Sequence, residues 1–183
     1  MIPAEVTAAL DAADLRYCVV GALALAVHGF PRFTADVDLL TTDDRALEEG
    51  RWTGVDALIR WGEEDDPIRG LVRCRTRPPV DVIVGRRPAM AFAVATAELE
   101  PALGALVATP VAFTLLKLEA GSPHDIADAS RVLEAQRHIR GDDSLVGELA
   151  AHAELLSPWG RRAYERLLRD LAQPTRPPFR APP

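Results

Sequence analysis

The stretch Val20-Gly21-Ala22, followed after thirteen residues by Asp36-Val37-Asp38-Leu39, decides the fold of this chain of 183 residues. The apolar run over residues 17–20 predicts a short buried strand. The alanine- and leucine-rich residues 22–28 predict a helix. Gly21 therefore lies where the strand turns into the helix. Glycine there lets the backbone come close to a ligand, and the unpaired amides of the first helical turn favour a phosphate group.

Three aspartates are the candidate chemical groups. Residues 35–40 alternate in polarity and predict a strand, so Asp36 and Asp38 point to the same face of it. Asp81 lies in a second apolar strand, expected over residues 80–84. Each aspartate alone could be an ordinary exposed strand residue. If the two strands are neighbours, however, three carboxylates converge on one spot.

Converging carboxylates repel one another, and a divalent cation relieves this repulsion. Mg²⁺ prefers hard oxygen ligands together with substrate phosphates, and Mn²⁺ suits similar ligands. Two such ions can activate an attacking hydroxyl and stabilise a leaving pyrophosphate. We therefore expect Asp36, Asp38 and Asp81 to be catalytic and metal-binding residues of a nucleotidyl transfer reaction, with Mg²⁺ or Mn²⁺ as the cofactor.

The remainder of the chain mixes strands and helices first and ends in helices. A further strand is expected over residues 69–75, and helices over residues 3–14, 45–49, 55–60, 109–120, 122–139, 145–156 and 159–171. This order predicts an α+β fold with a small mixed β-sheet core, flanking helices and a helical C-terminal part. The expected division is a core over 1–108, a helical part packed on it over 109–172, and a disordered proline-rich tail over 173–183.

The composition is that of a globular protein, with 48% hydrophobic and 26% charged residues. The net charge of −6 argues against a general nucleic-acid binder, although 21 Lys and Arg residues leave room for a basic cleft. Cys18 and Cys74 lack metal-ligand spacing and are expected to be buried free thiols. The first residues lack a basic start and a long apolar stretch, so no signal peptide is expected, and no apolar run approaches the roughly 20 residues of a membrane span. We expect a cytoplasmic protein without a membrane partner.

The residues quoted above resemble the signature of the DNA polymerase beta-type nucleotidyltransferase fold, a glycine turn followed by Asp-x-Asp on a strand. The longer block over residues 17–40, which includes His28-Gly29-Phe30-Pro31-Arg32-Phe33-Thr34-Ala35, is similar to the AbiEii-type branch. A second block, Leu115-Leu116-Lys117-Leu118-Glu119-Ala120 and then Asp125-Ile126-Ala127-Asp128, follows in the expected order. The resemblance covers roughly residues 15 to 135 and implies a fold, an activity and a set of binding residues.

The resemblance implies roles beyond those of the three aspartates. Lys117 is similar in position to a lysine that contacts nucleotide phosphates. Arg32 and Thr34 match the segment that helps to hold the nucleotide, and Asp128 matches an acidic position that orients the base or the lysine. The turn residues Gly21 and Ala22 complete the nucleotide-binding set.

Two positions depart from the family pattern. The family usually has Gly-Gly or Gly-Ser at the turn, so Ala22 lacks a hydroxyl for the phosphate but keeps its amide. The AbiEii branch often has a basic residue where this chain has Pro123-His124. Ordinary structural roles stay open as well: Lys117 could only extend its amine to water, and Asp125 could be a first-turn helix carboxylate.

These observations favour an enzyme that moves a nucleoside monophosphate from a nucleoside triphosphate to a hydroxyl, with release of pyrophosphate. The acceptor could be RNA, above all tRNA, a protein or a small molecule. The AbiEii resemblance implies a bacterial toxin with an antitoxin partner. The alternatives are a minimal nucleotidyltransferase antitoxin that modifies a partner toxin, and a non-catalytic nucleotide- or partner-binding module of the same fold.

Overall fold

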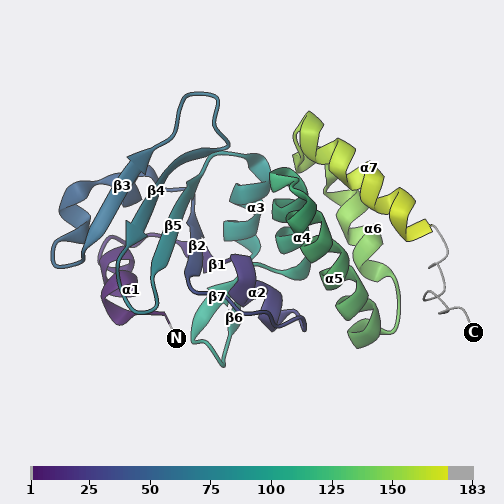
Figure 1. The fold of residues 1–183 in the computed structure, drawn as a ribbon, viewed down its shortest axis with the longest axis horizontal. Helices are drawn as coiled ribbons and strands as arrows, with labels where there is room; N and C mark the ends of the chain where they lie inside the picture. Colours follow the sequence, from purple (N-terminus) through teal and green to yellow (C-terminus); the bar gives the residue numbers. More distant parts are fainter. Residues whose placement is uncertain (1, 173–183) are drawn as a thin grey trace, which may run out of the picture.

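The structure, a computed structural model, describes residues 2–172 and contains one mixed sheet with helices on both faces (Figure 1). The strands are β1 (Tyr17–Val19), β2 (Val37–Thr41), β3 (Ala57–Trp61), β4 (Ile68–Cys74), β5 (Val80–Gly85), β6 (Glu98–Glu100) and β7 (Ala105–Val107). The α-helices are α1 (Ala4–Asp11), α2 (Gly21–Val27), α3 (Pro88–Thr96), α4 (Pro110–Ala120), α5 (Pro123–Arg140), α6 (Ser144–Ala151) and α7 (Pro158–Ala172). Short 3-10 helices are η1 (Asp44–Leu47), η2 (Glu49–Trp52) and η3 (Ala153–Leu155).

The strand order in the sheet is β3-β4-β5-β2-β1-β7-β6. The pairs β2–β5 and β1–β7 are parallel, and the other neighbours are antiparallel. The predicted strands β2 and β5 are therefore direct neighbours near the middle of the sheet. This mixed sheet with its flanking helices confirms the expected α+β fold class.

The two faces of the sheet bury different sets of apolar side chains. Val6 and Leu10 of α1 belong to the same buried cluster as Leu39 and Val82. On the other face, Leu40 packs in a smaller cluster that includes Ala93 and Val94 of α3. Because successive strand residues point to opposite faces, Asp38 shares the α3 face with Leu40.

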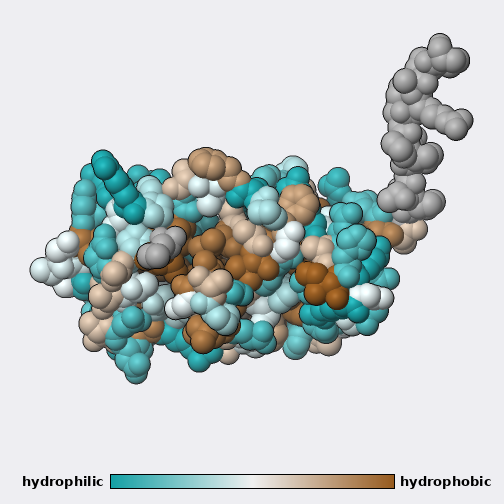
Figure 2. Space-filling model, turned by 90° about the horizontal axis from the view of Figure 1, so that it is seen from below, coloured by the Kyte–Doolittle hydropathy of each residue, from teal (hydrophilic) through white to brown (hydrophobic). Residues whose placement is uncertain are grey.

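Helices α4 to α7 lie side by side next to the sheet (Figure 1). Ser122 caps α5 through a hydrogen bond from the Asp125 amide at 3.2 Å. The surface seen from below is mostly hydrophilic, with a hydrophobic area near its middle (Figure 2). No helix within residues 2–172 is long and apolar enough to cross a membrane.

One predicted element is wrong. The helix expected over residues 55–60 is instead the edge strand β3, which pairs with β4 from Ala57 to Trp61. Short apolar runs fit either element, and here pairing with a neighbouring strand decides the outcome. The exposure of Leu58 (39%) and Trp61 (66%) fits a strand at the edge of the sheet.

Other elements differ in detail. The helix expected over 45–49 is formed by η1 and η2, and the one expected over 145–156 divides into α6 and η3. Helix α3 and the short strands β6 and β7 were not predicted. Cys18 and Cys74 are buried free thiols, as expected. The predicted disorder of residues 173–183 lies outside the described residues.

Candidate active site

Asp38 and Asp81 are direct partners across the parallel strands β2 and β5. Asp36 lies two residues before Asp38, where the chain enters the strand. Burial raises the pKa of Asp38, and the charges of Asp36 and Asp81 raise it further, while Lys117 and Arg32 lower it. The structure thus brings the three predicted carboxylates together on one face of the sheet.

Gly21 permits the close approach of α2 to Asp38. Its φ is +63°, a left-handed conformation that glycine adopts without strain. A Cβ atom at this position would overlap the carboxylate of Asp38. A backbone hydrogen bond also holds the turn at Gly21 next to β2, because the Val20 amide donates to the Asp38 carbonyl at 2.9 Å. Glycine is therefore required here by both conformation and space.

Arg73 clamps the third carboxylate. Its Nε and Nη2 atoms donate to Oδ1 and Oδ2 of Asp81 at 2.8 and 2.6 Å. The two residues are cross-strand partners in the β4–β5 pair. Sequence reasoning missed Arg73, although a signal was present: the expected strands over 69–75 and 80–84 are joined by a short proline-containing segment, which would place Arg73 opposite Asp81 in a hairpin.

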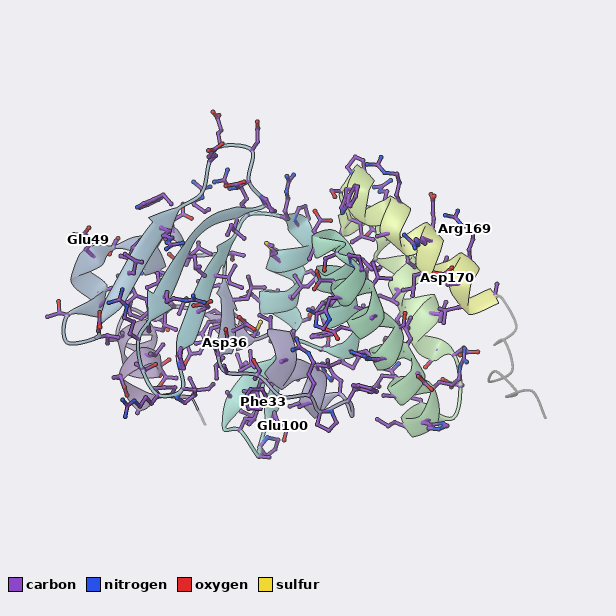
Figure 3. All side chains as sticks on the ribbon, viewed as in Figure 1. Phe33, Asp36, Glu49, Glu100, Arg169 and Asp170 are labelled. Atoms are coloured by element: carbon purple, nitrogen blue, oxygen red, sulfur yellow. The ribbon has the colours of Figure 1, made fainter. Side chains whose placement is uncertain are left out.

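Asp36 is held by its own segment. The hydroxyl of Thr34 donates to Asp36 Oδ1 at 2.8 Å, so Thr34 positions a carboxylate in addition to any contact with a nucleotide. Figure 3 shows Asp36 beside the strands, with the exposed Phe33 nearer the lower edge of the molecule. Within residues 2–172, no group of three or more His, Cys, Asp or Glu side chains is already arranged to hold a metal ion.

A second cluster surrounds the buried carboxylate of Asp128 on α5. Lys117 Nζ lies 3.3 Å from its Oδ2 atom, and Arg32 Nη2 lies 3.6 Å from the same atom. Arg131 and His124 also lie within 4 Å of Asp128. A fully buried charge needs such partners, so Asp128 gathers four basic side chains next to the three carboxylates.

Lys117 has a second partner in Asp125, whose Oδ1 atom accepts a hydrogen bond from its Nζ at 2.8 Å. Burial raises the pKa of Asp125, but hydrogen bonds from Lys117 and Ser122 outweigh this effect and hold the pKa below its ordinary value. Lys117 is therefore not a side chain that only reaches for water. Its side chain is 14% exposed and is fixed between two aspartates.

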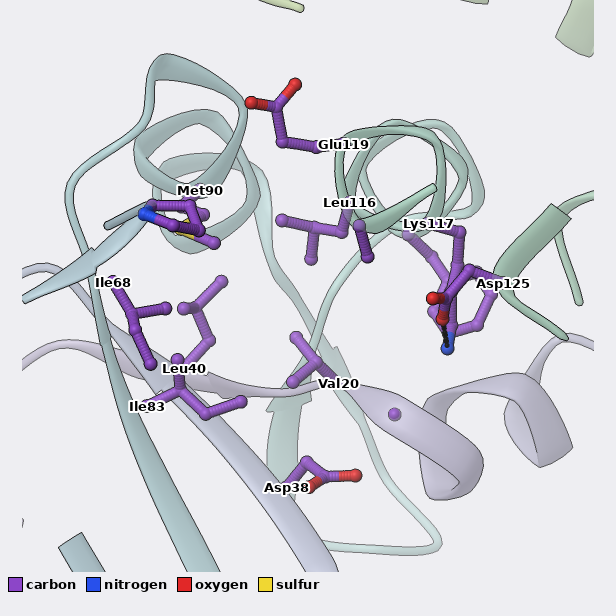
Figure 4. A pocket seen from close by; sticks show the side chains of 14 residues that line it. Val20, Asp38, Leu40, Ile68, Ile83, Met90, Leu116, Lys117, Glu119 and Asp125 are labelled. Carbon is purple, nitrogen blue, oxygen red and sulfur yellow. Dashed lines mark hydrogen bonds and ion pairs between the residues drawn. The ribbon is translucent and has the colours of Figure 1, made fainter. Parts of the chain in front are cut away.

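A cavity of about 330 Å³ opens beside Asp38, between the sheet and helices α3 and α4. Apolar side chains, among them Leu40, Ile83 and Leu116, form its wall (Figure 4). In this view, Asp38 lies at one end of the cavity, Glu119 at the opposite end, and Lys117 with Asp125 at the side. A volume of this size lies in the range of small-ligand sites, which are apolar with a few polar groups.

The predicted nucleotide-binding residues divide into two sets. Gly21 and Lys117 line this cavity. Ala22, Arg32, Thr34 and Asp128 do not; the side chain of Ala22 is buried at 3% exposure, and Arg32 is half-buried. Asp128 is connected to the cavity through its contact with Lys117, and Arg32 lies in the same cluster through its ion pair with Asp128.

No family model matches the chain, and its sequence matches no curated protein. Solved structures do match. The antibiotic-resistance factor ANT(2'')-Ia, a nucleotidyltransferase, aligns over 91% of both chains with 15% identity and a TM-score of 0.51. A nucleotidyltransferase-like protein from Paracoccidioides brasiliensis aligns over 71% of this chain and 73% of its own, with 20% identity and a TM-score of 0.40. The first of these likenesses shows that this chain has the nucleotidyltransferase fold.

Proposed function

We propose that this protein transfers a nucleoside monophosphate from a nucleoside triphosphate to a hydroxyl group and releases pyrophosphate. The observation that carries the proposal is the pairing of Asp38 with Asp81 across β2 and β5, with Asp36 two residues before Asp38. Asp38 lies at one end of a cavity that Lys117 also lines. A carboxylate that can bind a cation, Asp38, and an amine that can bind phosphates, Lys117, thus line one ligand-sized cavity.

The carboxylates suit a hard divalent cation. Mg²⁺ usually binds one or two protein carboxylates and completes its shell with water and substrate phosphates. Asp36 and Asp38 fit this role, because burial and then the charges of Asp36 and Asp81 raise the pKa of Asp38, and a cation would relieve the repulsion among the carboxylates. Asp81 can join them, since a carboxylate has about four acceptor sites and Arg73 uses two. When bound, Mg²⁺ or Mn²⁺ would neutralise charge on the phosphates.

The basic groups are placed to hold the triphosphate. Lys117 lies on the cavity wall, and Arg32 reaches the same cluster through Asp128. The amides at Gly21 and Ala22 begin α2 and have no acceptor within the helix. The apolar wall of the cavity suits the base of the nucleotide, because base stacking and burial need few hydrogen bonds.

The chemical step follows from this placement. The oxygen of the acceptor hydroxyl forms a bond to the α-phosphorus. The bond from the α-phosphorus to the oxygen bridging to the β-phosphorus breaks, and pyrophosphate leaves with that electron pair. The proton of the hydroxyl passes to a carboxylate of the cluster; Asp81, the cross-strand partner of Asp38, keeps acceptor capacity beside Arg73.

The biological role proposed is that of an AbiEii-like toxin which modifies an RNA such as tRNA and is controlled by an antitoxin. The alternative within the fold is an antitoxin that modifies a toxin protein. The supporting observations are the sequence block over residues 17–40 and the second block around Lys117, both at this site. In either role the chain acts in the cytoplasm.

The test incubates the protein and Mg²⁺ with each of the four α-labelled nucleoside triphosphates, in the presence of total cell RNA and protein. Label should appear in one acceptor class, and Asp36→Ala or Asp38→Ala should abolish it. Unchanged transfer in both variants would rule the mechanism out. Calorimetry tests the non-catalytic alternative, which the Gly21-Ala22 turn favours. That alternative predicts metal-dependent triphosphate binding without turnover on any acceptor.

A further inference from the structure

A second hollow lies on the other side of the Asp38–Asp81 pair. Its volume is about 310 Å³, and its lining includes Asp36, Arg73, Arg75, Thr76 and Pro79. The strand register fixes the relation between the two spaces. Leu40 and Ile83, two residues after Asp38 and Asp81, line the cavity beside Lys117. Asp36 and Pro79, two residues before them, line the second hollow, so the carboxylate pair separates the two spaces.

The charge of the second hollow is supplied by two arginines from β4 and its extension. Arg73 and Arg75 lie two residues apart, and the Arg75 amide continues the ladder by donating to the Asp56 carbonyl at 2.8 Å. Both side chains therefore point to the face that carries Asp38 and Asp81. Arg73 is already paired with Asp81. Arg75 lies 3.8 Å from Asp56, and both of these side chains are well exposed, so this ion pair is worth little.

We propose that the second hollow binds the acceptor, and that the acceptor carries a phosphate close to its reactive hydroxyl. This inference rests on the proposed nucleotidyl transfer. Arg75 contacts the phosphate through the planar, bidentate hydrogen bonding that guanidinium groups provide. The hydroxyl lies at the inner end of the hollow, next to Asp36 and Asp81.

The two-sided arrangement agrees with the geometry of the reaction. In a phosphoryl or nucleotidyl transfer, the attacking and leaving oxygens lie roughly in line on opposite sides of the phosphorus. A triphosphate held by Lys117 in the cavity beside it places its α-phosphorus near Asp38. An acceptor in the second hollow then approaches from the opposite side. A polycationic acceptor is disfavoured here, because Arg73 and Arg75 would repel it.

Matched probes test the phosphate requirement directly. Ribose 5-phosphate and ribose both carry hydroxyls and differ in the phosphate alone. Each is titrated into the full ¹⁵N-labelled chain with Mg²⁺ and a non-hydrolysable nucleoside triphosphate analogue, and backbone amide shifts are followed by NMR. We expect ribose 5-phosphate, and not ribose, to shift the amides of Arg75, Thr76 and Asp36. A ribodinucleotide with one internal phosphate and a free 3′-hydroxyl forms a second arm.

Two substitutions assign the contact. Arg75→Ala should weaken binding of ribose 5-phosphate about tenfold, as expected for loss of a charged hydrogen bond. Arg77→Ala is the matched control, because Arg77 is exposed on the same segment but does not line the hollow. It should leave the affinity unchanged. Tighter binding of the dinucleotide than of the sugar phosphate would identify a nucleic-acid end as the source of the phosphate.

The outcomes separate this inference from the proposed function. If neither phosphate probe shifts the amides of the hollow while the triphosphate analogue still binds, the acceptor assignment is wrong and nucleotidyl transfer stands. Equal effects of Arg75→Ala and Arg77→Ala would also overturn it. If the triphosphate analogue itself does not bind with Mg²⁺, the proposed function fails, and the acceptor assignment fails with it.

Discussion

Asp38 and Asp81 are paired side by side on two parallel strands, and neither can move away from the other without breaking the sheet. Burial and the charges of Asp36 and Asp81 raise the pKa of Asp38 above its ordinary value of 3.8. A carboxyl with a raised pKa binds its proton more tightly in the folded than in the unfolded state. Its ionisation therefore lowers stability as the pH rises through the folded-state pKa.

Asp38→Asn should accordingly stabilise the fold near neutral pH while abolishing transfer. A gain on the order of 1 kcal/mol would raise the Tm of a chain this size by about 2–4 °C. The gain should shrink as the pH falls toward 3.8, because the wild-type carboxyl is then protonated too. Urea unfolding of both proteins at several pH values measures this difference. A destabilised variant at neutral pH would contradict the repulsion described here.

Gly21→Ala should disrupt the site through a clash with Asp38. Gly104→Ala is the matched control, because the φ of Gly104 is +62° against +63° for Gly21, and a Cβ at Gly104 meets open space. Both variants should lose about 1–2 kcal/mol from the left-handed conformation. Only Gly21→Ala should lose a further amount and all transfer activity. Equal unfolding free energies and equal activities for the two variants would show that Asp38 does not need this space.

Arg73→Ala should strengthen the binding of Mg²⁺. Removal of the guanidinium frees both oxygens of Asp81 and leaves more negative charge at the site. For this pair, in which Arg73 is exposed and Asp81 is mostly buried, we expect an effect of about 1 kcal/mol, or roughly fivefold in affinity. Calorimetric titration with MgCl₂ at constant ionic strength measures the change in affinity. The control is Arg69→Ala, because Arg69 lies on β4 like Arg73 but forms an exposed ion pair with Asp44 of η1. Weaker Mg²⁺ binding in Arg73→Ala would show that the clamp supports the cation site.

Asp128→Asn should separate the positioning of Lys117 from the chemistry at the carboxylates. The change keeps the shape of a fully buried side chain and removes the charge that Lys117 and Arg32 share. Loss of a buried ion pair costs about 3–5 kcal/mol. We expect that loss in urea unfolding, together with a rise in the KM for the nucleoside triphosphate that exceeds the fall in kcat.

Asp170→Asn is the control for this substitution, because it breaks an exposed pair with Arg166 on α7. It should change stability by less than about 1 kcal/mol. If Asp128→Asn behaves like this control in both measurements, then Asp128 does not hold Lys117 and Arg32 in place.

Much of the fold and of the site follows from local sequence. The alternation around Asp36 and Asp38 and the apolar neighbours of Asp81 predicted two strands correctly. That these strands, β2 and β5, are neighbours in the sheet is known only from the structure. The positions of Lys117 and Asp128 followed from the family resemblance, and the structure places both in one cluster with Arg32.

The errors arise where tertiary pairing decides. The run over residues 55–60 fits a helix or a strand equally well, and it becomes β3 because it pairs with the open edge of β4. Arg73 was missed because an isolated arginine in a strand is ordinarily a solvated side chain. Its role depends on the register of β4 against β5, which only the folded hairpin fixes.

The period of two along β2 also limits how this protein can vary. Val37 and Leu39 fill the interior on one face, while Asp36, Asp38 and Leu40 serve the other. A single inserted or deleted residue within β2 would turn the side chains of Asp36 and Asp38 into the apolar core. It would also move Val37 and Leu39 to the face that carries the site. Insertions and deletions in related sequences should therefore be confined to loops such as the one between β3 and β4. Within β2 itself we expect substitutions alone.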